Sequence, residues 1–228
     1  MAWIERRSIL PERVLGRAVT KCTRLGRAMA PSWSSTVFMT SFSSAARFSA
    51  VSVRLALAEV LWDNQRQLLV LDDVLTATDP ARLAAAVDVV ILCVTGTPQV
   101  EAVLLGEGGE SGDAGKGGVL AGLREGTVVI DCSTAVPTST ERVARAVQAA
   151  GGRFLDAPMT RTPKEAAEGR LNLLVGGDAE LFARMRPLLA CFAENITHVG
   201  PIGAGHRMKL LHNYVSLGTI ALIAEAAA

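Results

Sequence analysis

The chain has 228 residues, of which half are hydrophobic and a fifth are charged, and its formal net charge is +1. This length is enough for one large domain or two small ones. The composition excludes a disordered chain, a nucleic-acid-binding protein held by bulk charge, and a collagen-like fibre. The four cysteines are widely spaced, which argues against a disulfide framework or a metal site and for a reducing, cytoplasmic location. The apolar run Leu217–Ala224 is far shorter than the roughly 20 residues that span a bilayer, so we expect no membrane partner.

The N-terminal segment differs in composition from the rest of the chain. Residues 1–58 hold nine Lys/Arg and two acidic residues, whereas the remaining 170 residues hold 14 basic and 20 acidic residues. An Arg-rich, Ser-rich and acid-poor stretch is typical of an organellar transit peptide, but also of a flexible tail or of a stretch that is not the natural reading of its gene. No nucleic-acid-binding motif accompanies the basic residues, so we expect no nucleic-acid partner. We therefore treat residues 1–67 as a separate, atypical basic segment.

Strand and helix patterns alternate from residue 68 onward. Continuous apolar runs predict buried strands, and Asp or Pro at a start predicts a helix. The predicted strands cover residues 89–94, 127–130, 153–155, 171–175 and 196–199. The predicted helices cover residues 80–87 (with Asp79 as N-cap), 137–150 and 178–189, with one more starting at Pro98 before a Gly-rich loop over 106–118. This alternation predicts an α/β fold with a doubly wound parallel sheet over residues 68–202.

Ligands of doubly wound sheets bind at the carboxyl ends of the strands. The residues that follow the predicted strands are Thr95–Thr97, Asp131–Thr134 and Asp156–Arg161. These three stretches are therefore the first candidates for a functional site.

The C-terminal stretch 207–228 predicts one long, mostly apolar helix with a polar stripe. Lys209, His212, Asn213 and Ser216 stand at i, i+3, i+4 and i+7, so they share one helix face. A lysine among apolar neighbours has its pKa lowered and can donate or accept a proton. Alternatively, Lys209 extends its head group to solvent and Asn213 caps a neighbouring backbone group.

Four motifs occur in a fixed order over residues 79–228. They are D-C-S-T at 131–134 followed by Pro137, D-A-P at 156–158, GRLNLLVGG at 169–177, and G-x-G-x-x-x-K-x-x-x-N at 203–213. Together they resemble the β-hydroxyacid dehydrogenases, the superfamily of 3-hydroxyisobutyrate dehydrogenase and 6-phosphogluconate dehydrogenase. The resemblance implies a Rossmann-like cofactor domain over 68–202, and over 203–228 an inter-domain helix that is the start of a truncated all-α domain.

The resemblance also implies an activity. It is reversible hydride transfer between NAD or NADP and a small anionic aldehyde or 3-hydroxy acid, without a metal, and it allows a homo-oligomer. The alternative is a catalytically inactive fragment of such an enzyme that lacks pyrophosphate binding and at most pairs with an intact paralogue.

Individual roles follow from the matched motifs. In the resembling family the motif lysine is the general acid/base, which is Lys209, and the asparagine one turn later, Asn213, orients the substrate. Ser133 would hold the substrate carboxylate and Thr134 would contact the cofactor. The turn after the strand 89–94 would also contact the cofactor, through Val94, Thr95 and Gln99.

Two further residues match one branch of the superfamily. Arg161, in the turn after D-A-P, and Ser216, in N-Y-x-S after the lysine, resemble the branch with sulfolactaldehyde and related semialdehyde reductases. An arginine there would grip a carboxylate or sulfonate with two parallel hydrogen bonds. The alternative is that Arg161 is an ordinary loop residue at the surface. We expect His212 to pack beside the anion rather than to carry a proton.

The fingerprint G-x-G-x-x-G, which brings a bare backbone close to the pyrophosphate in this superfamily, does not occur. No glycine lies between Gly26 and Gly96. Only Leu25–Ala30 resembles the end of a fingerprint, with Lys21 and Thr23 where the first two glycines would be. Three interpretations stay open: a degraded or misassembled cofactor domain, a targeting extension with a mitochondrial location, and a diverged domain.

Overall fold

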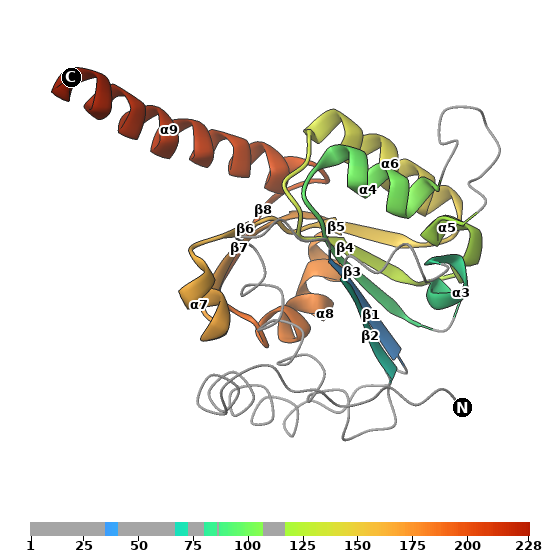
Figure 1. The fold of residues 1–228 in the computed structure, drawn as a ribbon. Helices are drawn as coiled ribbons and strands as arrows, with labels where there is room; N and C mark the ends of the chain where they lie inside the picture. The colour runs from blue at the N-terminus through green and yellow to red at the C-terminus, as the bar shows by residue number, and fades with distance from the viewer. Residues whose placement is uncertain (1–34, 41–66, 73–79, 86, 107–116) are drawn as a thin grey trace.

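The computed structural model describes residues 35–40, 67–72, 80–85, 87–106 and 117–228 (Figure 1). These residues form one mixed sheet in the order β2-β1-β3-β4-β5-β7-β6, with β8 beside β7. The strands are β1 (Ser35–Thr40), β2 (Gln67–Asp72), β3 (Val89–Cys93), β4 (Val128–Asp131), β5 (Arg153–Asp156), β6 (Met159–Thr160), β7 (Leu171–Gly177) and β8 (Ala193–Gly200). The strands β3, β4, β5, β7 and β8 overlap the predicted ones.

The sheet is parallel from β2 to β5, but the prediction that β7 is parallel as well was wrong. The strand β7 runs antiparallel to β5 and to β6, and parallel to β8. The chain after β5 forms β6, which pairs with β7 through Met159↔Leu173 and Thr160↔Asn172. It therefore turns back along the sheet edge, whereas a parallel neighbour of β5 would require a crossover over one face of the sheet.

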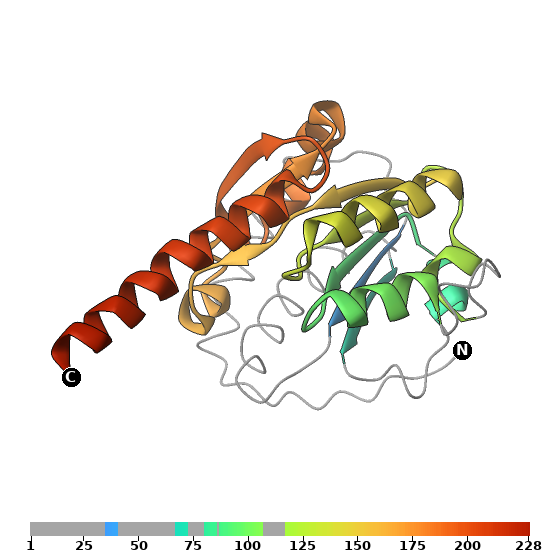
Figure 2. The same cartoon turned by 90° about the horizontal axis from the view of Figure 1, so that it is seen from above.

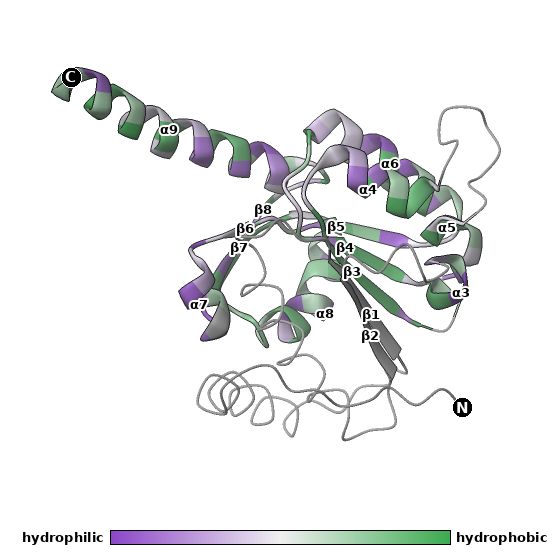
Figure 3. Cartoon of the chain, in the orientation of Figure 1, coloured by the Kyte–Doolittle hydropathy of each residue, from purple (hydrophilic) through white to green (hydrophobic). Residues whose placement is uncertain are grey.

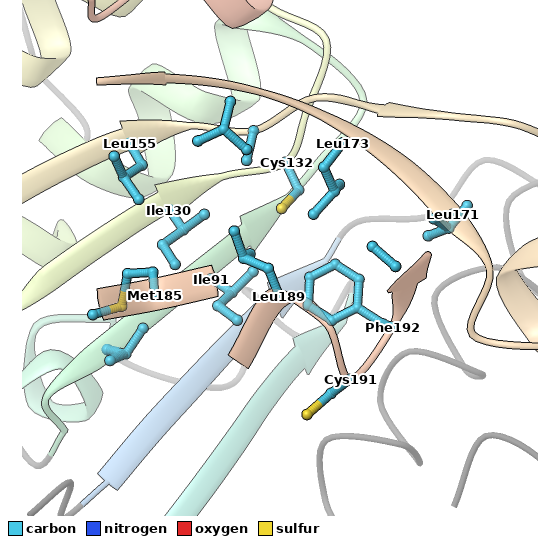
Figure 4. Packing of buried hydrophobic residues seen from close by; sticks show 14 of the residues in the cluster. Ile91, Ile130, Cys132, Leu155, Leu171, Leu173, Met185, Leu189, Cys191 and Phe192 are labelled. Carbon is cyan, nitrogen blue, oxygen red and sulfur yellow. The ribbon is translucent and has the colours of Figure 1, made fainter. Parts of the chain in front are cut away.

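Alternate side chains of β3 to β5 fill two cores. One face carries the members Ile91, Ile130 and Leu155, which pack with Met185 and Leu189 of the helix α8 (Ala179–Leu189) (Figure 4). The opposite face carries Val90, Leu92, Val129 and Phe154 and packs against the helices α4 (Thr97–Leu105) and α6 (Pro137–Ala149). Burial on both faces is the reason why these strands read as continuous apolar runs.

The helices begin where the sequence provides start signals. Pro98 and Pro137 lie in the first turns of α4 and α6, where a missing N–H leaves no hydrogen bond unmade. The Asp178 carboxylate accepts a 2.8 Å hydrogen bond from the Leu181 N–H at the start of α8. The remaining helices are α3 (Pro80–Ala84), α5 (Val119–Gly122), α7 (Pro163–Ala167) and α9 (Ala204–Ala227). The predicted N-cap of α3, Asp79, lies outside the described residues.

The helix α9 has 24 residues and extends away from the sheet (Figures 1 and 2). Polar and apolar residues alternate along it (Figure 3). Most of its large apolar side chains are exposed. By length and composition alone it could cross a membrane, a test that core helices of soluble proteins also pass. The sequence analysis counted only the apolar run Leu217–Ala224, whereas the whole helix Ala204–Ala227 is long and apolar enough to pass this test.

The strands β1 and β2 lie next to each other and reach into the segment 1–67 that the composition set apart. The strand β1 pairs with β2 on one side and with β3 on the other, through Thr40↔Cys93 at its carboxyl end. Residues 25–30, which resemble the end of a fingerprint, precede β1 and lie outside the described residues, as does most of the Gly-rich loop over 106–118.

Candidate functional site

The carboxyl ends of β4 and β5 place two aspartates side by side. Asp131 and Asp156 are paired neighbours in the sheet, and Leu92 of β3 is paired with Asp131. Because paired residues of adjacent strands point to the same face, both carboxylates lie on the face that α6 covers. Both residues are fully buried, so each carboxylate needs partners inside the protein.

His206 is the partner that both aspartates share. Its imidazole is fully buried, with Nε2 3.9 Å from Asp131 Oδ2 and Nδ1 3.9 Å from Asp156 Oδ2. Its Nε2 lies 3.1 Å from the Ser133 carbonyl oxygen and its Nδ1 lies 2.8 Å from the Thr140 hydroxyl of α6. The sequence analysis did not single out His206. The feature that could have identified it is its position inside the motif G-x-G-x-x-x-K, three residues before Lys209.

Asp156 holds the first turn of α9. Its Oδ1 accepts a 2.8 Å hydrogen bond from the Gly203 N–H, and its Oδ2 accepts a 2.9 Å hydrogen bond from the His206 N–H. Gly203 has φ 85°, a conformation that favours glycine. A Cβ on Gly205 would lie 2.8 Å from Asp156 Oδ2, so only glycine allows this approach. A carboxylate at a helix N-terminus also interacts favourably with the helix dipole.

Asp131 has a half-satisfied carboxylate. Its Oδ1 accepts a 2.9 Å hydrogen bond from the Ser133 N–H. Its Oδ2 is the one buried side-chain nitrogen or oxygen without a hydrogen bond in the described part of the chain. Burial raises the pKa of Asp131, and the charge of His206 and hydrogen bonds from the Ser133 side chain and backbone oppose that rise. The cluster of Asp131, His206 and Asp156 therefore balances buried charges over short distances.

Ser133 faces the protein rather than solvent. It is 3% exposed, and its hydroxyl oxygen accepts a 2.9 Å hydrogen bond from the Val94 N–H. Its backbone N–H donates a 2.9 Å hydrogen bond to Asp131 Oδ1. The Ser133 hydroxyl therefore connects the carboxyl ends of β3 and β4 through the hydrogen bond from the Val94 N–H. The role that the family resemblance implies for Ser133, holding the substrate carboxylate, stays a prediction.

The other residues predicted to contact a cofactor meet at the same edge. Thr95 and Gln99 are exposed and Thr134 is half-buried. A Cβ on Gly96 would lie 3.8 Å from the Gln99 side-chain oxygen and 3.9 Å from the Thr134 carbonyl, so both residues lie close to Gly96. Val94 is buried and contributes its backbone. Accessible hydroxyl and amide groups at this edge fit the nicotinamide and ribose end of a dinucleotide.

The polar stripe of α9 is confirmed in part. Lys209, Asn213 and Ser216 are half-buried, whereas His212 is exposed. Burial lowers the pKa of Lys209 from the ordinary lysine value of 10.5. The fully buried His206 is three residues before Lys209, so the stripe continues from the buried cluster at the carboxyl edge outward along α9.

Arg161 lies in the turn after β6, and its guanidinium has protein partners. Nη1 donates to the Glu194 carboxylate at 2.6 Å and to the Arg170 carbonyl at 2.5 Å. Arg161 also has φ 87°, the one non-glycine residue with positive φ among those described. Such a conformation costs about 1–2 kcal/mol for a residue with a Cβ. A glycine at this position would be unstrained.

The structure brings Val94, Gln99, Ser133 and Thr134 to one edge and starts the Lys209 stripe at the same place. It leaves Arg161 engaged with Glu194. Within the described residues no group of His, Cys, Asp or Glu side chains is arranged to hold a metal ion.

Comparison with known proteins agrees with this geometry. The family model for the NAD binding domain of 6-phosphogluconate dehydrogenase matches residues 60–200. The 2-hydroxy-3-oxopropionate reductase of Escherichia coli strain K12 is 37% identical over 145 residues, which cover 64% of this chain and 47% of that protein. The 3-sulfolactaldehyde reductase of the same strain is 36% identical over 151 residues, which cover 66% of this chain and 48% of that protein. The chain therefore spans about half the length of these curated relatives.

Solved structures share the fold. The Mycobacterium tuberculosis 3-hydroxyisobutyrate dehydrogenase, solved with L-serine, superposes with a TM-score of 0.65 and 25% identity. The superposition covers 86% of this chain and 64% of that chain. It extends the likeness beyond the stretch that the family model matches.

Proposed function

Since the chain belongs to the β-hydroxyacid dehydrogenase superfamily, with the NAD binding domain of 6-phosphogluconate dehydrogenase, we propose that it transfers hydride between NAD or NADP and a small aldehyde or 3-hydroxy acid carrying an anionic group. The observation that carries the proposal is that α9 is anchored by Asp156 and His206 at the carboxyl ends of β4 and β5. This anchor holds the first turn of α9, three residues before Lys209, beside the D-C-S-T turn.

We assign general acid/base chemistry to Lys209. Half-burial lowers its pKa, so its ammonium gives up a proton more readily than that of an exposed lysine. During aldehyde reduction Lys209 donates this proton from Nζ to the carbonyl oxygen. In the reverse direction the neutral amine takes the hydroxyl proton back.

The substrate anion is bound by groups around the same stripe. Asn213 and Ser216 lie one and two turns after Lys209 on the half-buried face, where they can orient the carbonyl and the acid group. Arg161 supplies the positive charge when it exchanges Glu194 for the substrate. The exposed ion pair that it would give up is worth only about 0.2–1 kcal/mol, so an anionic substrate can compete.

The nicotinamide cofactor would be held at its nicotinamide and ribose end by Thr95, Gln99, Thr134 and the backbone of Val94. When bound, it supplies the hydride that adds to the carbonyl carbon. We take residues 68–202 as the cofactor domain and 203–228 as the inter-domain helix. The bacterial relatives support a cytoplasmic location.

We identify no comparable set of residues that would bind the pyrophosphate of the cofactor. The strand β1 lies next to β3, so a fingerprint would follow Thr40. The sequence there, Ser41–Ala46, contains no glycine. A backbone with side chains at these positions approaches phosphates less closely. We therefore propose weak cofactor affinity, and a fully inactive fragment is the competing outcome.

Deuterium transfer tests the function even at low turnover. The chain is incubated for hours with millimolar [4-²H]NADH or [4-²H]NADPH and an aldehyde carrying a carboxylate or a sulfonate. Deuterium on the product carbinol carbon, detected by NMR, supports the proposal. Absence of product with both cofactors and both aldehydes, under conditions where a curated relative gives product, rejects it in favour of the inactive fragment.

A further inference from the structure

A second role at this site is visible in the buried cluster, which the proposed reaction does not use directly. His206 contacts three elements at once: the turn after β4 through the Ser133 carbonyl, α6 through Thr140, and β5 through Asp156. It is itself part of the first turn of α9. No other described histidine has a fully buried imidazole between two carboxylates.

The hydrogen on Nε2 of His206 is determined by its partner. A carbonyl oxygen only accepts hydrogen bonds, so at 3.1 Å from the Ser133 oxygen the Nε2 atom must donate. This holds whichever hydrogen lies between Nδ1 and the Thr140 hydroxyl, which is also 3.2 Å from the Val136 carbonyl. In the hydrogen bond between α9 and the Ser133 turn, His206 Nε2 is therefore always the donor and the Ser133 carbonyl oxygen the acceptor.

We propose that His206 is a positioning residue that locks the first turn of α9, and with it Lys209, to the turn that carries Ser133 and Thr134. Lys209 is on the same face of α9, three residues after His206, so a rotation or shift of this turn moves its ammonium directly. The alternative is that His206 only stabilises the buried cluster. The catalytic consequence rests on the proposed function, whereas the locking itself does not.

The two close glycines support locking rather than mere packing. The backbone of α9 comes within van der Waals contact of Asp156 at Gly205, and Gly203 adopts φ 85° to enter the helix. Asp156 then holds the N–H groups of Gly203 and His206. The helix start is thus held by its backbone through Asp156, and by a side chain through His206.

The test compares His206→Leu, which keeps bulk but has no donor, with His206→Gln, whose amide can donate to the Ser133 carbonyl. A misplacement of about 1 Å can reduce a rate by about 10²-fold, so we expect kcat to fall about 10–100-fold in His206→Leu with little change in the cofactor KM. His206→Gln should recover most of kcat. His198→Leu is the matched control, because it removes a histidine Nε2 bond to a carbonyl, that of Gly177, elsewhere in the fold.

A second readout is independent of activity. The chain has four lysines, at positions 21, 116, 164 and 209, so the ¹³C-methylated lysine resonances can be assigned with a Lys209→Arg variant. In His206→Leu we expect the titration midpoint of Lys209 to rise toward that of an exposed lysine. In His206→Gln and His198→Leu we expect it to stay at the wild-type value.

The proposal is overturned if folded His206→Leu keeps the wild-type Lys209 titration. Should that variant not fold, Thr140→Val replaces it, since it removes the partner of Nδ1 with little change of volume. An unchanged Lys209 titration in Thr140→Val then overturns the proposal equally. If the wild-type chain transfers no hydride at all, the proposed function fails, but the Lys209 titration still decides whether His206 positions it.

Discussion

The backbone N–H of Val94 donates a 2.9 Å hydrogen bond to the hydroxyl oxygen of Ser133, joining the ends of β3 and β4. Both groups are buried, so the turn that starts the cofactor edge and the D-C-S-T turn are fixed to each other. The same serine hydrogen-bonds to Asp131, which lies 3.9 Å from His206. The cofactor edge is in this way connected to the helix that carries Lys209.

This relationship predicts a stability effect for Ser133→Ala. The substitution leaves the Val94 N–H buried without an acceptor, which costs about 1–3 kcal/mol. We expect the free energy of unfolding, measured by urea denaturation, to fall by this amount. Ser216→Ala is the control, because Ser216 is half-buried and bonds only to the Asn213 carbonyl of its own helix.

The Ser133→Ala and Ser216→Ala variants should also differ in their KM for the substrate. Ser216→Ala should raise the KM for the anionic aldehyde at nearly unchanged stability. If instead Ser133→Ala leaves stability unchanged and raises that KM, Ser133 binds the substrate as the family resemblance implied.

The pH dependence of the reaction should follow Lys209. Its pKa lies below 10.5 because of burial, and aldehyde reduction requires the protonated form. The reduction rate should therefore be highest at low pH and fall as pH rises through the Lys209 pKa, whereas alcohol oxidation should rise through the same value. Rates in both directions over pH 6–10.5 check this, and two profiles with the same slope would contradict it.

Glu194 should compete with the substrate anion for the Arg161 guanidinium. Glu194→Gln releases the guanidinium from an exposed pair worth about 0.2–1 kcal/mol, so the KM for an anionic aldehyde should fall by up to about fivefold. Arg161→Lys should raise that KM, since an ammonium has no two-pronged geometry. The methyl ester of the same substrate is the control. Equal effects on acid and ester would remove Arg161 from the anion site.

Much of this architecture was predictable, for reasons that particular residues show. The strand β3 is apolar throughout, and β4 and β5 are apolar at their central positions, because both faces of the sheet are covered. The stripe from Lys209 to Ser216 follows helical spacing. The motifs that flank these elements then indicated the family. Asp178 and Pro137 marked the starts of α8 and α6 because their chemistry suits the first turn of a helix.

Other features depend on contacts between distant residues. The direction of β7 is decided by the hairpin-like return through β6, and a buried apolar run reads the same in either direction. The Arg161–Glu194 pair depends on the β7–β8 register, which pairs Leu171 with Ala193. The burial of His206 depends on Asp156 lying opposite Asp131. A local sequence pattern contains no information on any of these three features.

Cofactor affinity should be weak in this chain. With no glycine among residues 41–46, we expect the dissociation constant for NADH or NADPH to lie toward the millimolar end of ordinary enzyme constants, which run from about 1 μM to 1 mM. Fluorescence titration measures it. Replacing residues 1–72 by a β-α-β unit with an intact G-x-G-x-x-G should tighten binding. Micromolar binding by the unaltered chain would show that residues 1–67 bind the pyrophosphate in another way.

The central claim is that Lys209 supplies the proton at a site built on the carboxyl ends of β3 to β5. The most direct measurement is the rate of reduced-cofactor oxidation with an anionic aldehyde, for the wild-type chain and for Lys209→Ala, at cofactor concentrations set by the binding titration. We predict a rate loss of about 10²–10⁴-fold with the cofactor dissociation constant unchanged within about twofold. A Lys209→Ala protein that binds cofactor equally and keeps most of the wild-type rate would contradict the account.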